Sequence, residues 1–148
     1  MDDQFVEAMA EALVRKLRER EETMEELIEL GQAFVKAMQD REGLSSVDEI
    51  YAEDAESVEA VVPPNRYVRI AGGKDAIKAK REDWLKSYEI QNMNADGPYV
   101  HPPNRFGVRF EAEVSEKATG KKRTLREIAI YSVEDGKIVR EEFFMSPR

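Results

Sequence analysis

Apolar and charged positions alternate with the period of a helix over the first forty residues. Apolar side chains recur at three- and four-residue steps, first over 5–17 and again over 24–38, as on one face of an amphipathic helix. Thr23 and Glu26 have the spacing of a capping box. This spacing favours two helices, broken near residue 22, over one long kinked helix. Gly43 is typical of a residue that follows a helix and predicts an end near residue 42.

Shorter elements are predicted in the middle of the chain. Ser46 and Glu49 form a second capping box, which predicts a short helix through Tyr51. Residues 55–62 have the composition of a strand, and Pro63-Pro64 would end it.

A loop up to Gly72-Gly73 then leads into a predicted helix over 74–88. A strand over 89–100 should follow it, bent at Asp96-Gly97-Pro98.

The last third of the chain predicts an antiparallel meander. Three strand-like runs between residues 105 and 145 are joined by turns at Thr119-Gly120 and at Glu134 to Lys137. Helices therefore come first and an antiparallel sheet last, which indicates an α+β domain. A curved sheet around helices would leave a pocket at its open end.

Acidic residues interrupt apolar strand faces in this meander. Successive side chains of a strand point to opposite faces, so Glu127 and Glu141 should each project with apolar neighbours. A buried carboxylate must be protonated, paired or in contact with a wet cavity. For Glu127 the structural alternative is an ion pair with a neighbouring strand arginine such as Arg109.

Glu59 is a third acid of interest. It shares a strand face with Ser57 and Val61. If that face lines a pocket, partial burial would raise its pKa and make it a better base. Alternatively, the other face, with Val58 and Ala60, turns inward and leaves Glu59 in solvent.

Composition narrows the class of protein. The 148 residues form one domain with a 41% hydrophobic content and a net charge of −8, which argues against nucleic-acid and anionic-membrane partners. The chain has no cysteine and one histidine, so no disulfide framework and no His-rich metal site are expected. His101 is expected at a loop tip. With no signal-like N-terminus and no apolar run of membrane-spanning length, a cytoplasmic protein is expected.

Several motifs resemble the SnoaL-like branch of the nuclear transport factor 2-like superfamily over about residues 24 to 145. The motifs that carry the resemblance are Tyr51-Ala-Glu-Asp-Ala55, Ser57-Val-Glu-Ala60, Gly73-Lys-Asp-Ala-Ile77, Trp84, Gly97-Pro-Tyr-Val-His101, Arg105-Phe106, Val108-Arg-Phe110 and Asp135-Gly-Lys-Ile-Val-Arg-Glu-Glu-Phe-Phe144. The resemblance implies a cone-shaped fold, with N-terminal helices in the concave face of a curved antiparallel sheet with a mixed edge. Residues 1–22 would be a helical extension and 23–148 the SnoaL-like domain.

The resemblance also bears on chemistry. Ketosteroid isomerases of this superfamily use a base aspartate, a tyrosine and a protonated aspartic acid, a system that serves as a standard example of pKa tuning. These positions correspond to Glu59, Phe34 and Ala129 here, so one role of three is retained, and steroid-type isomerisation by that mechanism is not expected. The Asp-Arg-Asp arrangement of the epoxide-hydrolase relatives has no match.

We therefore take Glu59 and Glu127 as candidate catalytic acid and base, in either order, with no cofactor and no metal. The residues expected to line the pocket are Ser57, Glu141, Tyr131, Trp84, Phe34 and Phe143. Tyr51 is expected to pack the short helix, with a pocket hydroxyl as the alternative. The expected ligand is a small organic molecule. A non-catalytic binding module and an assembly domain are the alternatives.

A homodimer is also expected. The face of the central meander strand opposite Glu127 carries Thr124, Arg126, Ile128 and Ile130, and the neighbouring strands would add Phe106, Phe110 or Phe144. A contiguous exposed apolar patch usually marks an interface, and a two-fold contact between sheets is the simplest closed solution.

Overall fold

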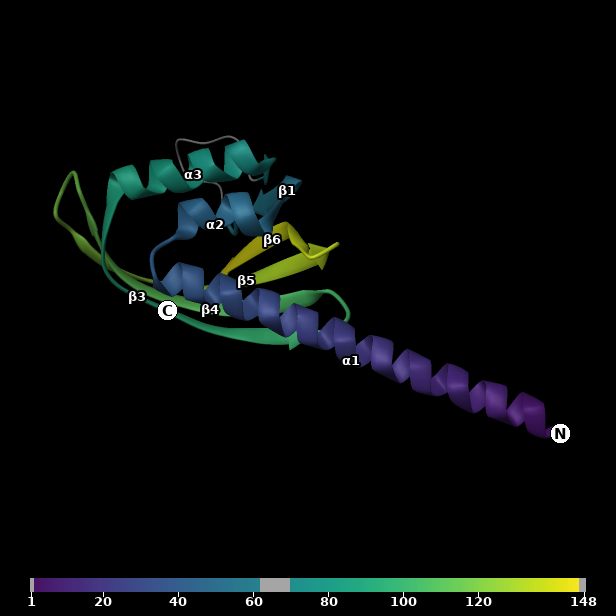
Figure 1. Ribbon diagram of the computed structural model, residues 1–148. Helices are drawn as coiled ribbons and strands as arrows, with labels where there is room; N and C mark the ends of the chain where they lie inside the picture. The colour runs from purple at the N-terminus through teal and green to yellow at the C-terminus, as the bar shows by residue number, and fades with distance from the viewer. Residues whose placement is uncertain (1, 62–69, 147–148) are drawn as a thin grey trace.

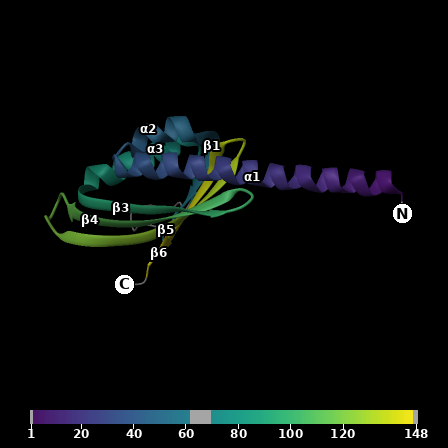
Figure 2. The same cartoon turned by 60° about the horizontal axis from the view of Figure 1, so that its bottom comes forward.

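A six-stranded mixed sheet with three helices on one side forms the body of the protein (Figures 1 and 2). The computed structural model describes residues 2–61 and 70–146. In chain order the elements are α1 (Asp3–Gln39), α2 (Gly43–Ile50), β1 (Tyr51–Val58), β2 (Ile70–Gly72), α3 (Lys74–Ser87), β3 (Tyr88–His101), β4 (Arg105–Glu116), β5 (Lys122–Glu134) and β6 (Lys137–Met145).

The strands lie in the order β2-β1-β6-β5-β4-β3. Strand β1 pairs with β6 in parallel, and every other neighbouring pair is antiparallel. The predicted α+β class with a mixed-edge sheet is therefore confirmed. The sheet is open rather than closed into a barrel.

Helix α1 is continuous, so the prediction of two helices broken near residue 22 is wrong. The Thr23 hydroxyl donates to the backbone carbonyl of Glu19 at 2.8 Å, which satisfies it inside the helix instead of at a cap. The helix starts after Asp2, whose carboxylate accepts a hydrogen bond from the backbone N–H of Gln4 at 3.0 Å. The helix therefore crosses the expected boundary between residues 22 and 23 without interruption.

The short helix and the first strand both start earlier than predicted. Gly43 opens α2 instead of closing the preceding helix, and the Ser46 hydroxyl donates to the Gly43 carbonyl at 2.9 Å within α2. Tyr51 is the first residue of β1 and not the last of the helix, and β1 spans 51–58 instead of 55–62. The predicted stop at Pro63-Pro64 lies outside the described residues.

The next helix and strand agree with the sequence. Helix α3 and strand β3 match the predicted 74–88 and 89–100 within about one residue. The short strand β2 was expected to be loop, but it pairs with β1 and sets Ala71 opposite Ser57. The predicted bend lies where the β3–β4 register shifts, between Asp96 and Tyr99.

The meander of β4, β5 and β6 is confirmed. Asp135 and Gly136 take positive φ values of 50° and 72° in the turn between β5 and β6, a backbone conformation that Asp and Gly accept in tight hairpins. Ala129 and Tyr131 on β5 are buried, with exposed fractions of 0% and 1%, so this face of β5 turns toward the helices. Glu127 belongs to the same face by alternation.

The opposite face of β5 is the outer surface of the sheet. Ile128 lies opposite Phe144 of β6, and each is 48% exposed. The expectation that Phe106 would join this outer patch is wrong. Phe106 is 1% exposed and stacks on Tyr131 with the ring centroids 4.9 Å apart, and Phe110 pairs opposite Glu127 on the same inner face.

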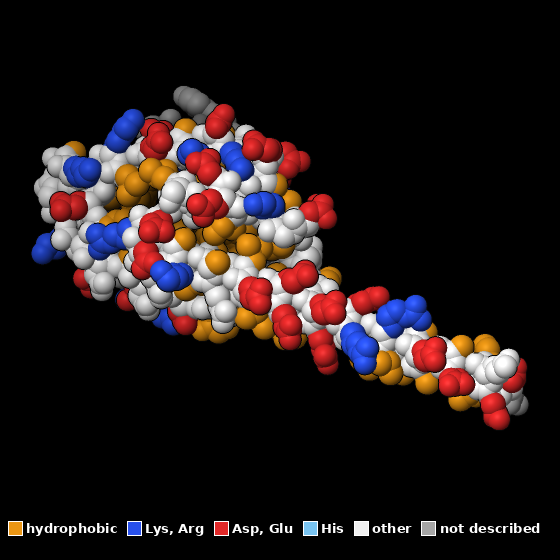
Figure 3. Space-filling model, viewed as in Figure 1, with side chains coloured by type: hydrophobic (Ala, Val, Ile, Leu, Met, Phe, Trp, Pro, Cys, Tyr) orange, Lys and Arg blue, Asp and Glu red, His pale blue; other side chains and the backbone are white. Residues whose placement is uncertain are grey.

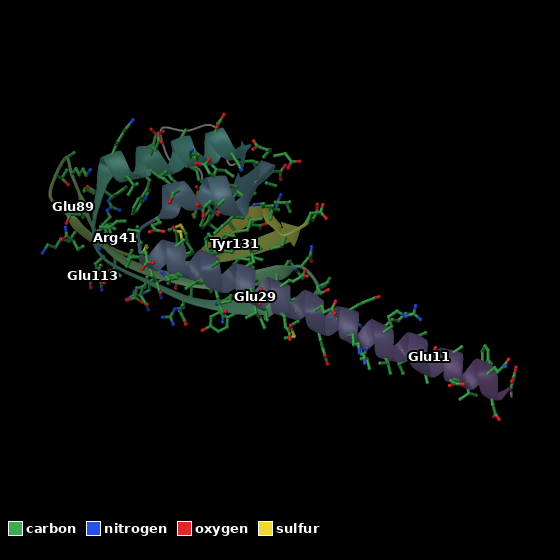
Figure 4. All side chains as sticks on the ribbon, in the orientation of Figure 1. Glu11, Glu29, Arg41, Glu89, Glu113 and Tyr131 are labelled. Carbon is green, nitrogen blue, oxygen red and sulfur yellow. The ribbon has the colours of Figure 1, made fainter. Side chains whose placement is uncertain are left out.

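Aromatic residues fill the interior between the second half of α1 and the sheet. The ring of Phe34 lies 4.5 Å from Tyr131, 6.0 Å from Phe106 and 6.4 Å from Tyr51 between centroids. Figure 4 labels Tyr131 in the body and Glu11 on the part of α1 that projects away from it. A side chain at Gly31 would place its Cβ 2.6 Å from Pro98, so α1 can approach β3 this closely only with glycine there.

Candidate functional site

A completely buried carboxylate lies where β1, β6 and α3 meet. Glu141 of β6 has 0% exposure, and the parallel pairing of β1 with β6 sets Ser57 directly opposite it. The Glu141 carboxylate accepts hydrogen bonds from the hydroxyl of Tyr51 and, at 2.8 Å, from the hydroxyl of Ser57. We call Tyr51, Ser57, Arg81 and Glu141 the inner cluster.

Arg81 of α3 supplies the positive charge of the inner cluster. Its guanidinium Nη2 lies 3.2 Å from Glu141 Oε2 and donates to the Tyr51 hydroxyl at 2.7 Å. Nη1 donates to the carbonyl of Gly43 in α2. Burial acts to lower the pKa of Arg81, but its interactions with Tyr51 and Glu141 outweigh burial and raise the pKa above its usual range. The cation therefore stays charged and compensates the buried carboxylate.

The inner cluster is closed to further chemistry. Burial raises the pKa of the Tyr51 hydroxyl well above its usual value, so this group remains a hydrogen-bond donor. Among the described residues, no buried side-chain nitrogen or oxygen lacks a hydrogen-bond partner. The cluster ties α2, α3, β1 and β6 together, which is a structural role.

A second group of charges, the outer cluster, consists of Glu59, Lys80 and Glu127. Lys80 of α3 forms an ion pair with Glu59, which follows β1, with 2.6 Å between Nζ and Oε1. The same ammonium donates to the Ser57 hydroxyl, which links the two clusters. It also lies 4.9 Å from the centroid of the Phe143 ring, a distance typical of a cation–π contact.

The carboxyl group of Glu127 has a raised pKa. Burial raises the pKa of its carboxyl group above the usual value, and the negative charge of Glu59 raises it further, while Lys80 acts in the opposite direction. The expected ion pair with Arg109 is not formed, because Arg109 lies 3.7 Å from Glu111 on the other side of the strand. The outer cluster thus combines an ion-paired glutamate with a second glutamate whose pKa is raised.

A recess lies beside α3. Figure 3 shows a sunken, mainly apolar area between the C-terminal part of α3 and the strands. Half-buried aromatic residues on these elements include Trp84 on α3, Phe110 on β4 and Phe143 on β6. The rings of Trp84 and Tyr88 lie 5.1 Å apart between centroids.

Two other hollows lie elsewhere, along β3, β4 and β5. One has a volume of about 380 Å³ and is lined by Gln91, Glu113, Val114, Lys122, Arg123 and Thr124. The other has a volume of about 450 Å³ and is lined by Asn92, Met93, Asn94, Glu111 and Glu113. Neither includes Glu59 or Glu127.

The structure brings some of the predicted site residues together and separates others. Glu59 and Glu127 both lie beside Lys80, whereas Ser57 and Glu141 belong to the inner cluster. Phe34 and Tyr131 are fully buried in the aromatic core. His101 is exposed at the end of β3.

Lys80 and Arg81 were missed in the sequence. They stand three and four residues after the buried Ile77 and ahead of Trp84 on α3. Cations within an otherwise apolar helical stripe were the available signal. Tyr51 was expected to pack the short helix; it does pack in the core, and its hydroxyl also bonds Glu141.

Neither a metal site nor a membrane span is found over 2–61 and 70–146. In these ranges no group of three or more His, Cys, Asp or Glu residues is arranged to hold a metal ion. No helix within them combines the length and the apolar character needed to cross a membrane.

Comparison with known proteins places the chain in a family. The sequence profile of the SnoaL-like domain matches residues 24–145. A crystal structure of a Mesorhizobium loti protein, provisionally named a SnoaL-like polyketide cyclase, is 30% identical with a TM-score of 0.72, over 78% of this chain and 96% of that one. A Bacillus subtilis protein provisionally named an isomerase is 21% identical with a TM-score of 0.67, over 84% and 89% of the two chains.

A nuclear transport factor 2-like protein of unknown function from Burkholderia pseudomallei shares the fold at 20% identity, with a TM-score of 0.58 over 86% of this chain and 90% of that one. No curated protein matches the chain by sequence. The profile covers most of the chain, and the first of these relatives is similar in both sequence and fold. The chain therefore belongs to the SnoaL-like domain family of the nuclear transport factor 2-like superfamily.

Proposed function

We propose that the protein binds a small organic molecule in the recess beside α3 and moves a proton on it by acid–base catalysis without a cofactor. The observation that carries the proposal is the outer cluster, in which two acids and one cation share a half-buried site. Glu59 is held in an ion pair, and Glu127 has a raised pKa. An acid with a raised pKa beside a fixed cation suits proton transfer near neutral pH.

Glu127 is the group that exchanges the proton. A raised pKa makes its carboxylate a stronger base than an ordinary glutamate side chain and lets it hold the proton it has taken. In an isomerisation, Glu127 removes a proton from a carbon next to a carbonyl and returns it to another carbon of the same molecule. Atoms and charge balance, because the enzyme ends the cycle in its starting protonation state.

Lys80 offsets the negative charge that develops on the substrate oxygen, and Glu59 positions Lys80. The ammonium is anchored from two sides, by Glu59 and by Ser57, and its side chain is 13% exposed. A fixed cation in a partly desolvated site stabilises developing negative charge more than a mobile one in water. The apolar surface of the recess suits a substrate with a substantial hydrophobic part.

The names of two relatives are compatible with this chemistry. The Mesorhizobium loti and Bacillus subtilis proteins are provisionally named a polyketide cyclase and an isomerase. Cyclisation and isomerisation are reactions of organic molecules, and proton transfer is one way in which they proceed.

Deuterium incorporation tests the proposal. The full chain is incubated in D₂O with a panel of small ketones and 1,3-diketones, and loss of the proton signals at the carbons next to the carbonyl is followed by NMR. We expect exchange above the buffer rate for at least one probe, reduced about 100-fold or more in Glu127→Gln. Glu113→Gln is the matched control, because it removes an exposed carboxylate from the neighbouring strand β4. Exchange equal to that of buffer for the whole panel, or equal in the two variants, would contradict the proposal.

A non-catalytic ligand-binding or assembly domain is the second candidate. It is favoured by the filled aromatic interior, where Phe34, Phe106 and Tyr131 occupy the centre of the cone. A probe that shifts NMR signals of Trp84 and Phe143 without any deuterium exchange would support binding alone.

A further inference from the structure

The first part of α1 forms an arm that projects from the body. The arm spans Asp3–Thr23, and Figures 1 and 2 show it extending beyond the edge of the sheet. At 1.5 Å per residue it is about 30 Å long. The first buried residue of α1 is Leu27, beyond the arm.

The arm carries an apolar stripe with no partner among the described residues. Its large apolar side chains are about half exposed, with 55% for Phe5, 56% for Met9, 59% for Leu13 and 49% for Leu17. Figure 3 shows hydrophobic side chains along the arm. Val6 and Val14 of the arm are also exposed, at 49% and 48%.

The stripe continues the face by which α1 packs on the body. Leu13 and Leu17 are followed by Met24, Leu27 and Gly31, at intervals of seven, three and four residues, so all of them lie along one side of the helix. In the second half of α1 this side is covered by the sheet. In the arm the same side of the helix is also apolar, but no other described part of the chain packs against it. In proteins, most of the stability of a helix comes from packing of its apolar face against a partner.

Charge is unevenly distributed along the arm. The charged residues of the N-cap and of the first half of the arm are all acidic, namely Asp2, Asp3, Glu7 and Glu11. All the cations stand in the second half, where Arg15, Lys16, Arg18 and Arg20 outnumber the acids Glu19, Glu21 and Glu22. Two arms side by side in the same direction would set the two acidic halves against each other. Two arms in opposite directions would set the acidic half of each against the half of the other that carries the cations.

We propose that the arm pairs with the arm of a second copy of this chain, in the antiparallel direction. A register that sets Met9 beside Leu13 of the second copy also sets Phe5 at the level of the second copy's Leu17. The same register places Asp2 and Asp3 beside the second copy's Arg20, which interrupts the apolar stripe. The contact is two-fold symmetric and therefore closed.

This dimer differs from the one expected on the outer face of the sheet. The arm lies outside residues 24–145, which the SnoaL-like profile covers, whereas the patch of Ile128 and Phe144 lies on β5 and β6. Antiparallel pairing places the two bodies at opposite ends of the paired helices and leaves the recess beside α3 open. The inference is therefore independent of the proposed chemistry.

Sedimentation equilibrium of the full chain tests the pairing. We expect a dimer at micromolar concentration and a dissociation constant raised at least about 100-fold in Leu13→Glu, which puts a charge into the stripe of both copies. Ile128→Glu is the matched control, because it places the same charge on an apolar side chain of similar exposure on the sheet. It should leave the dimer unchanged. Leu13 lies on the arm and does not contact the body. The Leu13→Glu variant should therefore still melt as a folded domain.

A charge exchange tests the direction of pairing. Arg20→Glu should weaken the dimer about 10-fold, and adding Asp3→Lys should restore it to within about 3-fold of the unmodified chain. Arg15→Glu makes the same charge change on the opposite side of the helix and should have little effect. A monomeric unmodified chain, a dimer unaffected by Leu13→Glu, or a dimer lost in Ile128→Glu and retained in Leu13→Glu would each overturn the proposal.

Discussion

The inner and outer clusters use similar groups, but they differ in how fully each carboxylate is satisfied. In the inner cluster one buried acid, Glu141, accepts hydrogen bonds from Tyr51, Ser57 and Arg81. In the outer cluster the ammonium of Lys80 is paired with Glu59, and the pKa of Glu127 is raised even though Lys80 acts to lower it. We therefore propose proton transfer only at the acid whose charge is incompletely compensated. A fully bonded acid holds the fold together.

Removal of the inner carboxylate should have the largest effect. Glu141→Ala leaves Arg81 buried without its partner, and we expect a loss of about 3–5 kcal/mol in the free energy of unfolding. Urea denaturation followed by circular dichroism measures it. The double variant Glu141→Met/Arg81→Met should recover much of the loss, because it removes both charges at once. A loss below about 1 kcal/mol in Glu141→Ala would show that the inner cluster does not stabilise the fold.

Glu127→Gln should have a smaller effect of opposite sign. A carboxyl group whose pKa is raised in the folded state stabilises the fold below its unfolded pKa, and this contribution is lost as the pH rises through the folded pKa. At pH 7 the charged, half-buried Glu127 therefore lowers stability. The glutamine variant should be more stable there, by on the order of 1 kcal/mol.

Thermal melts at pH 7 and pH 4 check this prediction. The gain of Glu127→Gln over the unmodified chain should be present at pH 7 and should shrink or vanish at pH 4, where the native carboxyl group is largely protonated. Glu113→Gln, on the exposed side of β4, serves as the control and should show no such pH dependence. A destabilised Glu127→Gln at pH 7 would mean that the carboxylate is well compensated after all.

Sequence alone predicted the element order apart from the break in α1 and the missing strand β2, but it did not predict the contacts that separate the two clusters. The meander was predictable because Gly120 and Gly136 mark its turns and because strand-like runs lie on both sides of each turn. The alternation of side chains along a strand placed Glu127 on the inner face. These signals are local, so they can be recognised without the tertiary structure.

The partners of the acids depend on long-range contacts. Arg81 and Tyr51 reach Glu141 from positions 60 and 90 residues away in the chain. No local pattern links such positions, and Ser57 and Glu141 were therefore expected in a pocket together with Glu127. The break in α1 was predicted from the capping spacing at Thr23, whereas the hydroxyl is satisfied inside the helix. A capping box carries little weight when the apolar stripe continues through it.

Substitutions of the charged residues near Glu127 should have the smallest effects. They should change the pKa of Glu127 and leave the fold intact. Glu59→Gln removes a nearby negative charge and should lower the pKa of Glu127. Lys80→Met removes the ammonium and should raise it. Carboxyl-carbon NMR titration of the two variants measures both shifts. Two shifts of the same sign would contradict the opposite effects of Glu59 and Lys80 on Glu127.

The carboxyl-carbon NMR titration of Glu127 in the unmodified full chain tests the central claim most directly. The ordinary glutamate pKa is about 4.3, and the same resonance in the urea-unfolded chain supplies the reference value. We predict a pKa for Glu127 in the folded protein that is clearly above this reference, because burial and Glu59 both disfavour its charged form. A folded-state pKa equal to or below that of the unfolded chain would contradict the assignment of Glu127 as the proton-exchanging group.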